Sequence, residues 1–307
     1  MKRLEQWLAR SRSLMRSARS TLPGRASHHR PVRLVLRLND IGLASGLVRS
    51  TGPLLPLAAW QDAIVQFIQW LGPIRVAFSG GEPAESSLLV PLVHFSNRLE
   101  CPTHLITAGS IDVKTAEVLV DSGLGAVTVL VGGVDEGTHQ RVVGRPLEMA
   151  SSTLDNLHRA RQRRSRPVQL LVGVPLSEQN LSSLEAIGGW ARQAGADAVL
   201  ATVPLGTDAP PGAAEAISRL GRDNRTPSHL TDWLDGRRTR PHGGLRAELL
   251  SDGTLLASPC TGPLGSLGKA DPRTLWEGAE EQIRAAREHP RPWDEVELVP
   301  EYLRSYR

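Results

Sequence analysis

An alternation of strand-like and helix-like segments limits the fold of this 307-residue chain more than any other feature of its sequence. Short apolar runs predict six strands, and apolar residues recur at helical spacing between them. Strands that alternate with helices are typical of parallel βαβ units. Six strands are too many for one mononucleotide-binding half and too few for a closed eight-stranded barrel. We therefore predict an α/β fold, a partial (β/α)6 TIM-like barrel. The strands are expected near residues 32–38, 74–78, 103–107, 126–131, 168–174 and 197–204, and the helices near 56–71, 84–98, 112–122, 147–162 and 180–193.

The pattern changes after Pro204. A stretch rich in Pro, Gly, Asp and Arg predicts a loop-rich connection. Two short apolar runs then flank Ser251-Asp252-Gly253, which predicts a β-hairpin, and a last helix is expected over 272–288. This C-terminal part is a small hairpin and helix extension. The predicted organisation is a basic amphipathic leader with its linker over 1–31, the partial barrel over 32–206, the connection over 207–244 and the extension over 245–307.

The positive charge of the chain is concentrated in the predicted leader. Residues 1–30 hold eight Lys or Arg against one Glu, a net charge of +7. Because the whole chain has a net charge of +4, residues 31–307 have a net charge of −3. With few aromatic residues for base stacking and no nucleic-acid motif, nucleic-acid binding is not expected. No apolar run is long enough to span a membrane, and we predict a cytoplasmic protein.

The segment 74–83, IRVAFSGGEP, combines a buried strand with a glycine turn that ends in a carboxylate. Gly80 and Gly81 allow a sharp turn that exposes backbone N–H and C=O groups, and Pro83 suits the first turn of a helix. Such a turn at the carboxyl end of a sheet can hold a small polar ligand. A tight strand-to-helix turn without a ligand explains the same residues equally well.

The chain contains two cysteines, Cys101 and Cys260. Two thiols cannot build a four-cysteine zinc site or supply three thiolates to a [4Fe–4S] cluster. We interpret Cys101 as core or strand-edge filler and Cys260 as a small buried hydrophobe. No metal site is predicted.

Six segments, in order, resemble the radical S-adenosylmethionine (radical SAM) enzymes, in particular the subgroup with a SPASM or shorter "twitch" C-terminal extension. The similarity covers roughly residues 32–277. The resemblance implies the partial (β/α)6 barrel, with a cofactor pocket at Ser79, Gly80, Gly81 and Glu82. The segments are LVLRLND, FSGGEP, LITAGS, GLGAVTVLVGGVDEGTH with VVGRP, VGVPLSEQNLSSL, and LSDGTLLASPC followed by LGSLG and TLWEG.

One departure from this family decides our expectation about cofactors. The family holds a [4Fe–4S] cluster through CxxxCxxC just after the first strand, and the cluster binds S-adenosylmethionine. Here the loop reads NDIGLASGLVRS, which places Gly42, Gly46 and Arg49 at the three ligand positions, or Asn39, Leu43 and Gly46 in a shifted frame. Neither frame offers a thiolate. We therefore expect no iron–sulfur cluster, and S-adenosylmethionine binding is possible but disfavoured. Other cofactor-contact positions differ as well: Ala108, Leu130, Gly132 and Val143.

Few other residues suggest chemistry. His139, expected on a loop after the fourth strand, could form an acid–base pair with Asp135 or Glu136, although a structural role is favoured. The leading hypothesis is a pseudoenzyme: a non-catalytic binding or partner subunit in peptide modification or cofactor and natural-product maturation. Its partner would be an active radical SAM paralogue or a precursor peptide.

Two rival hypotheses stay open at this point. The same barrel mouth could serve non-radical chemistry, with Glu82, His139 and Arg145 as catalytic candidates. Alternatively, the chain could be a cluster enzyme whose thiolates come from a partner chain. Whether the chain is an enzyme is left open, with the pseudoenzyme favoured.

Overall fold

A computed structural model describes residues 30–31, 33–40, 49–164, 167–202, 210–213, 215–217, 219, 246–258 and 262–288. Its centre is one sheet in the order β6-β5-β4-β3-β2-β1-β7-β8-β9. Strands β1 to β6 follow one another in space as in sequence and are all parallel. The predicted partial barrel is confirmed, with an open sheet. The strands are β1 Arg33–Arg37, β2 Arg75–Ser79, β3 Thr103–Thr107, β4 Ala126–Leu130, β5 Gln169–Pro175, β6 Ala198–Thr202, β7 Arg246–Leu249, β8 Thr254–Ser258 and β9 Pro263–Ser266.

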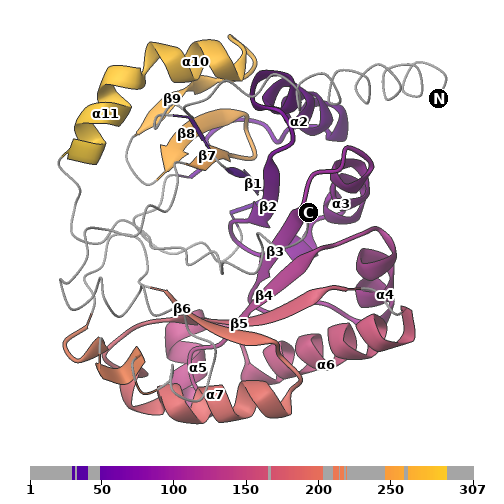
Figure 1. Ribbon diagram of the computed structural model, residues 1–307, viewed down its shortest axis with the longest axis vertical. Coiled ribbons are helices and arrows are strands. Elements are labelled where there is room, and N and C mark those ends of the chain that lie inside the picture. Colours follow the sequence, from indigo (N-terminus) through magenta and orange to yellow (C-terminus); the bar gives the residue numbers. More distant parts are fainter. Residues whose placement is uncertain are drawn as a thin grey trace.

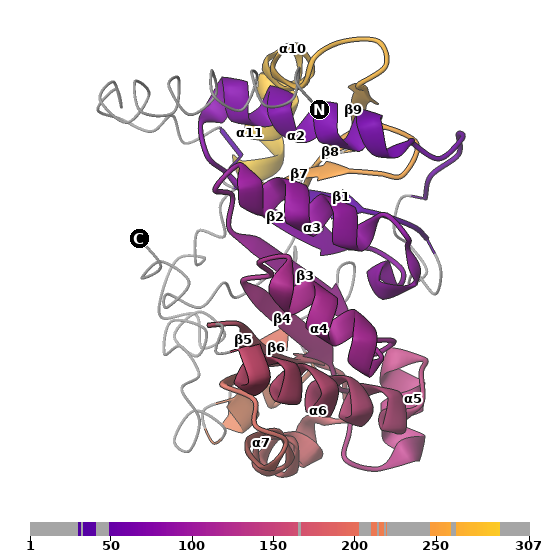
Figure 2. The same ribbon diagram turned by 90° about the vertical axis from the view of Figure 1, so that its right-hand side faces the viewer.

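Helices cover one face of this sheet (Figures 1 and 2). Figure 2 shows α2, α3, α4 and α6 side by side in front of the strands. No helix in the described part of the chain is long and apolar enough to cross a membrane. The helices are α2 Leu57–Leu71, α3 Leu89–Arg98, α4 Val113–Asp121, α5 Glu136–Val143, α6 Leu147–Arg164, α7 Leu184–Gln193, α10 Pro272–Gly278 and α11 Glu280–Glu288, with 3₁₀ turns η1 Pro83–Glu85 and η2 Leu181–Ser183.

The alternation of side chains along each strand separates two faces of the sheet. Leu34 and Leu36 of β1 belong to the main hydrophobic core beneath the helices, as do Val76 and Phe78 of β2. Arg33, Val35 and Arg37 alternate with the leucines and therefore lie on the opposite face, which we call the inner face. Every residue of β1 is buried, so the inner face begins with charged side chains that are shielded from water.

The predicted C-terminal hairpin extends the same sheet. Strand β7 pairs in parallel with β1, and β8 returns antiparallel to β7. Helices α10 and α11, yellow in Figure 1, lie beside these strands. Residues 1–29 of the leader and its linker lie outside the described residues, as do most of the predicted connection, Cys260 and the residues after 288. The four domain boundaries stay predictions.

Local signals identify several element ends. Asp112 caps α4 by accepting a hydrogen bond from the backbone N–H of Thr115, as predicted. Gly123 and Gly195 adopt positive φ (88° and 76°) just after α4 and α7, where helix ends were expected. Asn180 does not cap a helix, because its side chain bonds the backbone of Ser177 and Pro175 instead.

Several predicted boundaries are wrong. The helix expected over 272–288 is divided into α10 and α11, and the one expected over 180–193 begins with the 3₁₀ turn η2 before α7. The helix expected over 84–98 is split into η1 and α3, with residues 86–88 between them. The segment after β4, expected to be a loop, contains α5, and His139 lies within this helix. A short helix of low hydrophobicity gives little periodic signal, because few apolar residues mark its buried side.

Candidate functional site

The glycine turn after β2 packs tightly against β1. Gly80 and Gly81 adopt positive φ (79° and 37°). A Cβ atom added to Gly80 would lie 2.7 Å from Cγ of Arg37. The preceding residue, Ser79, is in register with Arg37. The turn therefore requires glycine at position 80 both for its backbone conformation and for the passage of an arginine side chain.

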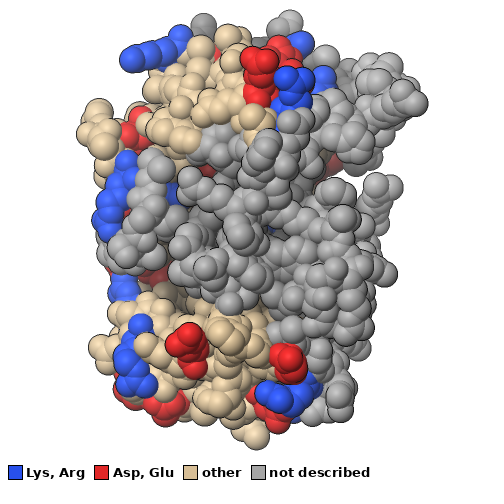
Figure 3. All heavy atoms as spheres, turned by 90° about the vertical axis from the view of Figure 1, so that its left-hand side faces the viewer, with Lys and Arg blue, Asp and Glu red and all other residues tan. Residues whose placement is uncertain are grey.

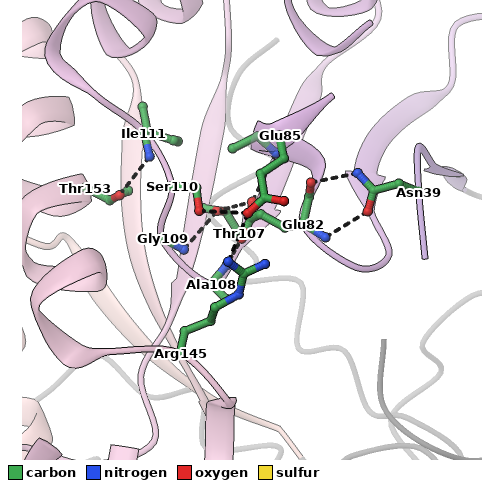
Figure 4. A network of polar contacts seen from close by, with 11 residues as sticks. Asn39, Glu82, Glu85, Thr107, Ala108, Gly109, Ser110, Ile111, Arg145 and Thr153 are labelled. Carbon is green, nitrogen blue, oxygen red and sulfur yellow. Dashed lines mark hydrogen bonds and ion pairs between the residues drawn. The ribbon is translucent and has the colours of Figure 1, made fainter. Parts of the chain in front are cut away.

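The carboxylate of Glu82 lies at the centre of a buried network at the carboxyl ends of β2 and β3 (Figure 4). Its side chain reaches back across the turn, and the residue is 1% exposed. Oε1 accepts hydrogen bonds from the hydroxyl of Thr107 at 2.6 Å and from the backbone N–H of Ala84 at 3.0 Å. Oε2 accepts one from the backbone N–H of Ala108 at 2.8 Å. Both carboxylate oxygens are thus used to join the β2 turn to the end of β3.

Asn39 ties the segment after β1 to the same residue. Its side-chain amide donates to the backbone C=O of Glu82 at 2.8 Å, and its oxygen accepts from the backbone N–H of Glu82 at 3.0 Å. This two-point contact resembles the pairing of two strands, although it is made by a side chain. In the sequence, Asn39 is only an alternative ligand position, and no local pattern predicts this contact.

Arg145 lies on the outer side of this network (Figure 4). Its guanidinium contacts Oε1 of Glu85 at 2.9 Å, and the Ser110 hydroxyl lies 3.5 Å from the same oxygen. The Arg145 and Glu85 side chains are 24% and 34% exposed, which places this ion pair at the rim. Arg145 and Glu82 therefore lie in one region, but each has a different partner.

The side chain of His139 makes no hydrogen bond to Asp135 or Glu136, its predicted acid–base partners. The residue is completely buried, and its Nδ1 lies 3.4 Å from the backbone N–H of Gly132, which donates to it. Among the described residues, Nε2 has no hydrogen-bond partner. Burial lowers the pKa of His139, although the charge of Glu136 acts in the opposite direction. Asp135 instead accepts from the backbone N–H of Thr138 at 2.8 Å and caps α5.

The hairpin between β7 and β8 fastens the segment that follows the loop after β1. Oδ2 of Asp252 accepts hydrogen bonds from the backbone N–H groups of Thr51 at 2.8 Å and Gly52 at 3.1 Å. Beside them, the hydroxyls of Ser50 and Ser251 lie 2.6 Å apart. The sequence predicts Asp252 in a hairpin turn but does not predict this role, because the contact spans about two hundred positions.

The described residues do not form a metal site. No three His, Cys, Asp or Glu side chains of the described part are grouped so that they could hold a metal ion. Cys101 is buried at the other end of the sheet, before β3, and burial raises the pKa of its thiol to about 11. Gly42, Leu43 and Gly46 lie outside the described residues, whereas Arg49 is described and exposed. With two cysteines, this chain cannot supply the three thiolates that the family's cluster takes from one loop.

Comparison with curated proteins gives two relatives with the same name. The chain is 30% identical over 138 residues to the PqqA peptide cyclase of Bradyrhizobium diazoefficiens, which covers 45% of this chain and 35% of the relative. It is 28% identical over 146 residues to the PqqA peptide cyclase of Gluconobacter oxydans, covering 47% and 39%. This chain thus matches less than two-fifths of the length of these relatives. No protein-family model matches the sequence.

Solved structures share the fold over most of the chain. Streptococcus suis SuiB bound to S-adenosylmethionine matches with a TM-score of 0.60 and 13% identity, over 81% of this chain and 64% of SuiB. Native anSMEcpe with bound S-adenosylmethionine and the Cp18Cys peptide matches with a TM-score of 0.56 and 13% identity, over 84% of both chains. Both proteins bind the ligand for which the predicted superfamily is named.

The relationship to the radical SAM superfamily is confirmed. Two of the similar proteins act on a peptide, as their name, PqqA peptide cyclase, states. SuiB has also been solved with its precursor peptide SuiA, and that structure matches with a TM-score of 0.59, 13% identity and coverage of 81% of this chain and 65% of SuiB.

Our expectation about cofactors is contradicted by these relatives. We expected no iron–sulfur cluster and disfavoured S-adenosylmethionine. SuiB and anSMEcpe are solved with S-adenosylmethionine bound, and the radical SAM superfamily holds this ligand on an iron–sulfur cluster. The missing thiolates in the loop after β1 misled the prediction, because the absence of ligands from one chain does not establish that the cofactor is absent.

Proposed function

We propose that this chain is a binding subunit in a radical SAM system that modifies a peptide. Two observations on similar proteins support the peptide. The curated relatives are peptide cyclases, and the fold is shared with SuiB bound to its precursor peptide and with anSMEcpe bound to a peptide. The chain would contribute its partial barrel to the recognition of such a peptide.

The hydrogen bonding of Glu82 is the observation that favours binding over acid–base catalysis. A general acid or base needs an oxygen or nitrogen within reach of the substrate. Both carboxylate oxygens of Glu82 already accept hydrogen bonds inside the fold, and the residue is buried. His139 is buried behind the turn after β4, and Arg145 is paired with Glu85. The rival hypothesis of non-radical catalysis by these three residues therefore gains no support.

We further propose that S-adenosylmethionine binds beside the turn of Ser79, Gly80, Gly81 and Glu82, and that a partner chain contributes thiolates to the cluster. The turn bears no side chain of its own at two successive positions, which exposes its backbone groups to a ligand on the side that the Arg37 side chain does not fill. This chain has only two cysteines. A cluster held by three thiolates beside the loop after β1 would therefore need cysteines from a second polypeptide. An active radical SAM paralogue is a suitable partner. A cytoplasmic location stays a prediction.

Peptide binding is tested with the full chain and a labelled probe. Fluorescence anisotropy of labelled PqqA peptide, titrated with the chain, is expected to give saturable binding in the micromolar range, about −8 kcal/mol. A scrambled peptide of the same composition is the control. Equal binding of the native and scrambled peptides would refute the peptide-binding proposal.

Cofactor binding is tested separately. The chain is reconstituted anaerobically with iron and sulfide, alone and together with the radical SAM protein encoded nearest to it. We expect cluster absorbance and stoichiometric iron in the mixture beyond the sum of the two separate samples. Calorimetry with S-adenosylmethionine on the chain alone and on the mixture shows which of the two samples binds the ligand. Iron content that is merely additive would rule out a shared cluster.

A further inference from the structure

The inner face of the sheet carries three arginines at one level. Arg33 of β1 is in register with Arg75 of β2 on one side and with Arg246 of β7 on the other. Adjacent strands lie roughly 4.8 Å apart. Residues in register on neighbouring parallel strands point to the same face, so the three side chains leave the sheet next to one another. We call this set the arginine row.

The arginine row lies below the surface and faces away from the helix-covered core. Leu34, the next residue of β1, is fully buried in the core, which places Arg33 on the inner face. Arg33 itself is only 4% exposed, and Arg75 and Arg246 are partly buried. Like charges opposite one another in a sheet are destabilising, and more so where water does not screen them. The row therefore gathers three guanidinium groups that can each donate to an anion, although each of them also interacts within the chain.

A cavity opens at this end of the sheet. It has a volume of about 330 Å³ and is lined by Arg33 and Arg75, by His104 of β3 and by the loops before β3, β4 and β5. Volumes of this order are typical of sites for small molecules. Pro102, Leu124 and Val168 add apolar wall, and Glu100 adds a carboxylate. The lining thus combines two guanidinium groups with an apolar surface and one negative charge.

This cavity is separate from the candidate site described above. It lies at the amino ends of β2, β3 and β4, whereas Glu82 lies beyond the carboxyl end of β2. A strand of five residues spans about 16 Å. A ligand in the cavity would therefore not contact the glycine turn.

We propose that this cavity binds a small organic anion, whose carboxylate or phosphate group is held by Arg33 and Arg75 and whose apolar body lies against the neighbouring loops. Guanidinium groups bind both kinds of anion through pairs of parallel hydrogen bonds. Glu100 disfavours a second negative charge elsewhere in the ligand. The three arginines of the row each make an interaction within the chain as well, so the anion must share or displace that partner. The proposal does not depend on the proposed function.

Two probes with the same apolar ring distinguish the two anionic groups. Phenyl phosphate and benzoate are titrated into the full chain by isothermal calorimetry, with inorganic phosphate as a ligand that lacks the apolar body. We expect saturable binding of at least one ring-bearing anion, tighter than that of inorganic phosphate. The tighter of the two shows whether a phosphate or a carboxylate is preferred. Absence of heat with both ring-bearing anions would overturn the proposal.

Three variants locate the site. Arg75→Gln is expected to weaken binding about tenfold or more, because it removes one of the two guanidinium contacts. Arg246→Gln changes the row but not the cavity lining, and a smaller loss of about two- to threefold is expected from the reduced potential. The matched control is Arg273→Gln, which removes the same charge from α10, where the side chain is 59% exposed and paired with Glu277. Equal affinities of the position-75 and position-273 variants would overturn the assignment.

A second substitution covers the case in which Arg75→Gln does not fold, as judged by circular dichroism. Arg75→Lys keeps the positive charge but loses the planar guanidinium fork. A loss of affinity is expected here too, of about threefold or more. Wild-type affinity in Arg75→Lys would show that Arg75 does not hold the anion directly and would reject the proposed contact.

Discussion

The two ends of the parallel sheet use charged residues in opposite ways. At the carboxyl end, the Glu82 carboxylate is buried under three donors that belong to the protein itself. At the amino end, Arg33 and Arg75 stand in register beside a cavity of about 330 Å³. The buried carboxylate holds the strand ends together at the carboxyl end, whereas the arginines at the amino end line a cavity. The difference indicates that a buried charge in this fold can be either a structural link or a binding group.

The exposed surface shows a third arrangement. On the face in Figure 3, acidic and basic side chains of the described residues lie next to each other at both ends of the molecule. Ion pairs of this kind, such as Arg284–Glu281 and Arg219–Glu185, join side chains that are more than half exposed. Exposed pairs contribute little to stability. The two buried clusters are therefore the informative ones.

The largest expected effect is the loss of stability on substituting a glycine at the carboxyl end of the sheet, and it is compared with the same substitution at the amino end. Gly109, after β3 at the carboxyl end, has φ of 102°, and an added Cβ would lie 2.7 Å from the backbone nitrogen of Ala150. Because that backbone belongs to α6 and cannot move aside, Gly109→Ala should lower the free energy of unfolding by on the order of 4 kcal/mol. Urea denaturation followed by circular dichroism measures this loss.

The matched variant is Gly123→Ala at the amino end. Its φ is 88°, and the added Cβ would meet the side chain of Asn97, which is exposed and can rotate away. The expected loss is about 1–2 kcal/mol, the ordinary cost of a left-handed conformation. A loss for Gly123→Ala that equals the loss for Gly109→Ala would show that the carboxyl end is no more tightly packed than the amino end.

Glu82→Gln tests the structural link at the carboxyl end. The new amide group must face N–H or O–H donors of Thr107, Ala108 or Ala84, which leaves at least one buried donor without an acceptor. The expected loss is about 2–3 kcal/mol in the free energy of unfolding. Glu85→Gln is the control, since the Arg145–Glu85 pair is partly exposed and should cost less than about 1 kcal/mol. Equal costs would mean that Glu82 is not a structural link.

The sequence predicted the order of the parallel strands but not the contacts between them. Alternating apolar segments were sufficient to predict β1 to β6, and the two glycines and Pro83 indicated the turn after β2. The bond between Glu82 and Thr107 depends on how β2 and β3 lie side by side, which no local pattern contains. The sequence indicates that Glu82 and Thr107 are polar residues near strand ends, but it does not indicate that they bond to each other.

The arginine row shows the same limit more strongly. Arg33 and Arg37 are spaced so that both lie on one face of β1, and this is readable from the alternation RLVLR. Arg246 joins Arg33 and Arg75 in the arginine row only because β7 pairs with β1 across more than two hundred positions. The hairpin pattern of β7 and β8 predicts a separate extension, and it does not indicate the face that β7 shares with β1. Likewise, the burial of His139 became visible only when the segment after β4 formed α5.

Asp252→Asn addresses the link between the hairpin and the segment after β1. Burial acts to raise the pKa of Asp252, but the backbone N–H groups of Thr254, Thr51 and Gly52 together lower it. Asparagine keeps one acceptor oxygen and places an NH2 group where the other was, so a loss of about 1 kcal/mol is expected. Hydrogen exchange should accelerate at Thr51 and Gly52 where the NH2 group replaces Oδ2, or at Thr254 where it replaces Oδ1. Unchanged exchange at these amides, with Asp62→Asn on the exposed side of α2 as control, would contradict the link.

The smallest expected effect concerns the pH dependence of stability through His139. Burial lowers the pKa of this imidazole below its ordinary value of 6.5, so the unfolded chain binds more protons at this residue in mild acid than the folded chain does. The neutral ring therefore contributes stability that is fully present above about pH 6.5 and is lost as the pH falls toward the lowered pKa. In urea denaturation at pH 7.5 and 5.5, His139→Asn should lose less stability between the two pH values than the wild type. Asparagine can still accept from the Gly132 N–H but does not titrate. Identical losses in both proteins would show that folding does not disfavour the protonated form of His139, and the comparison would then rest on Glu82 alone at the carboxyl end.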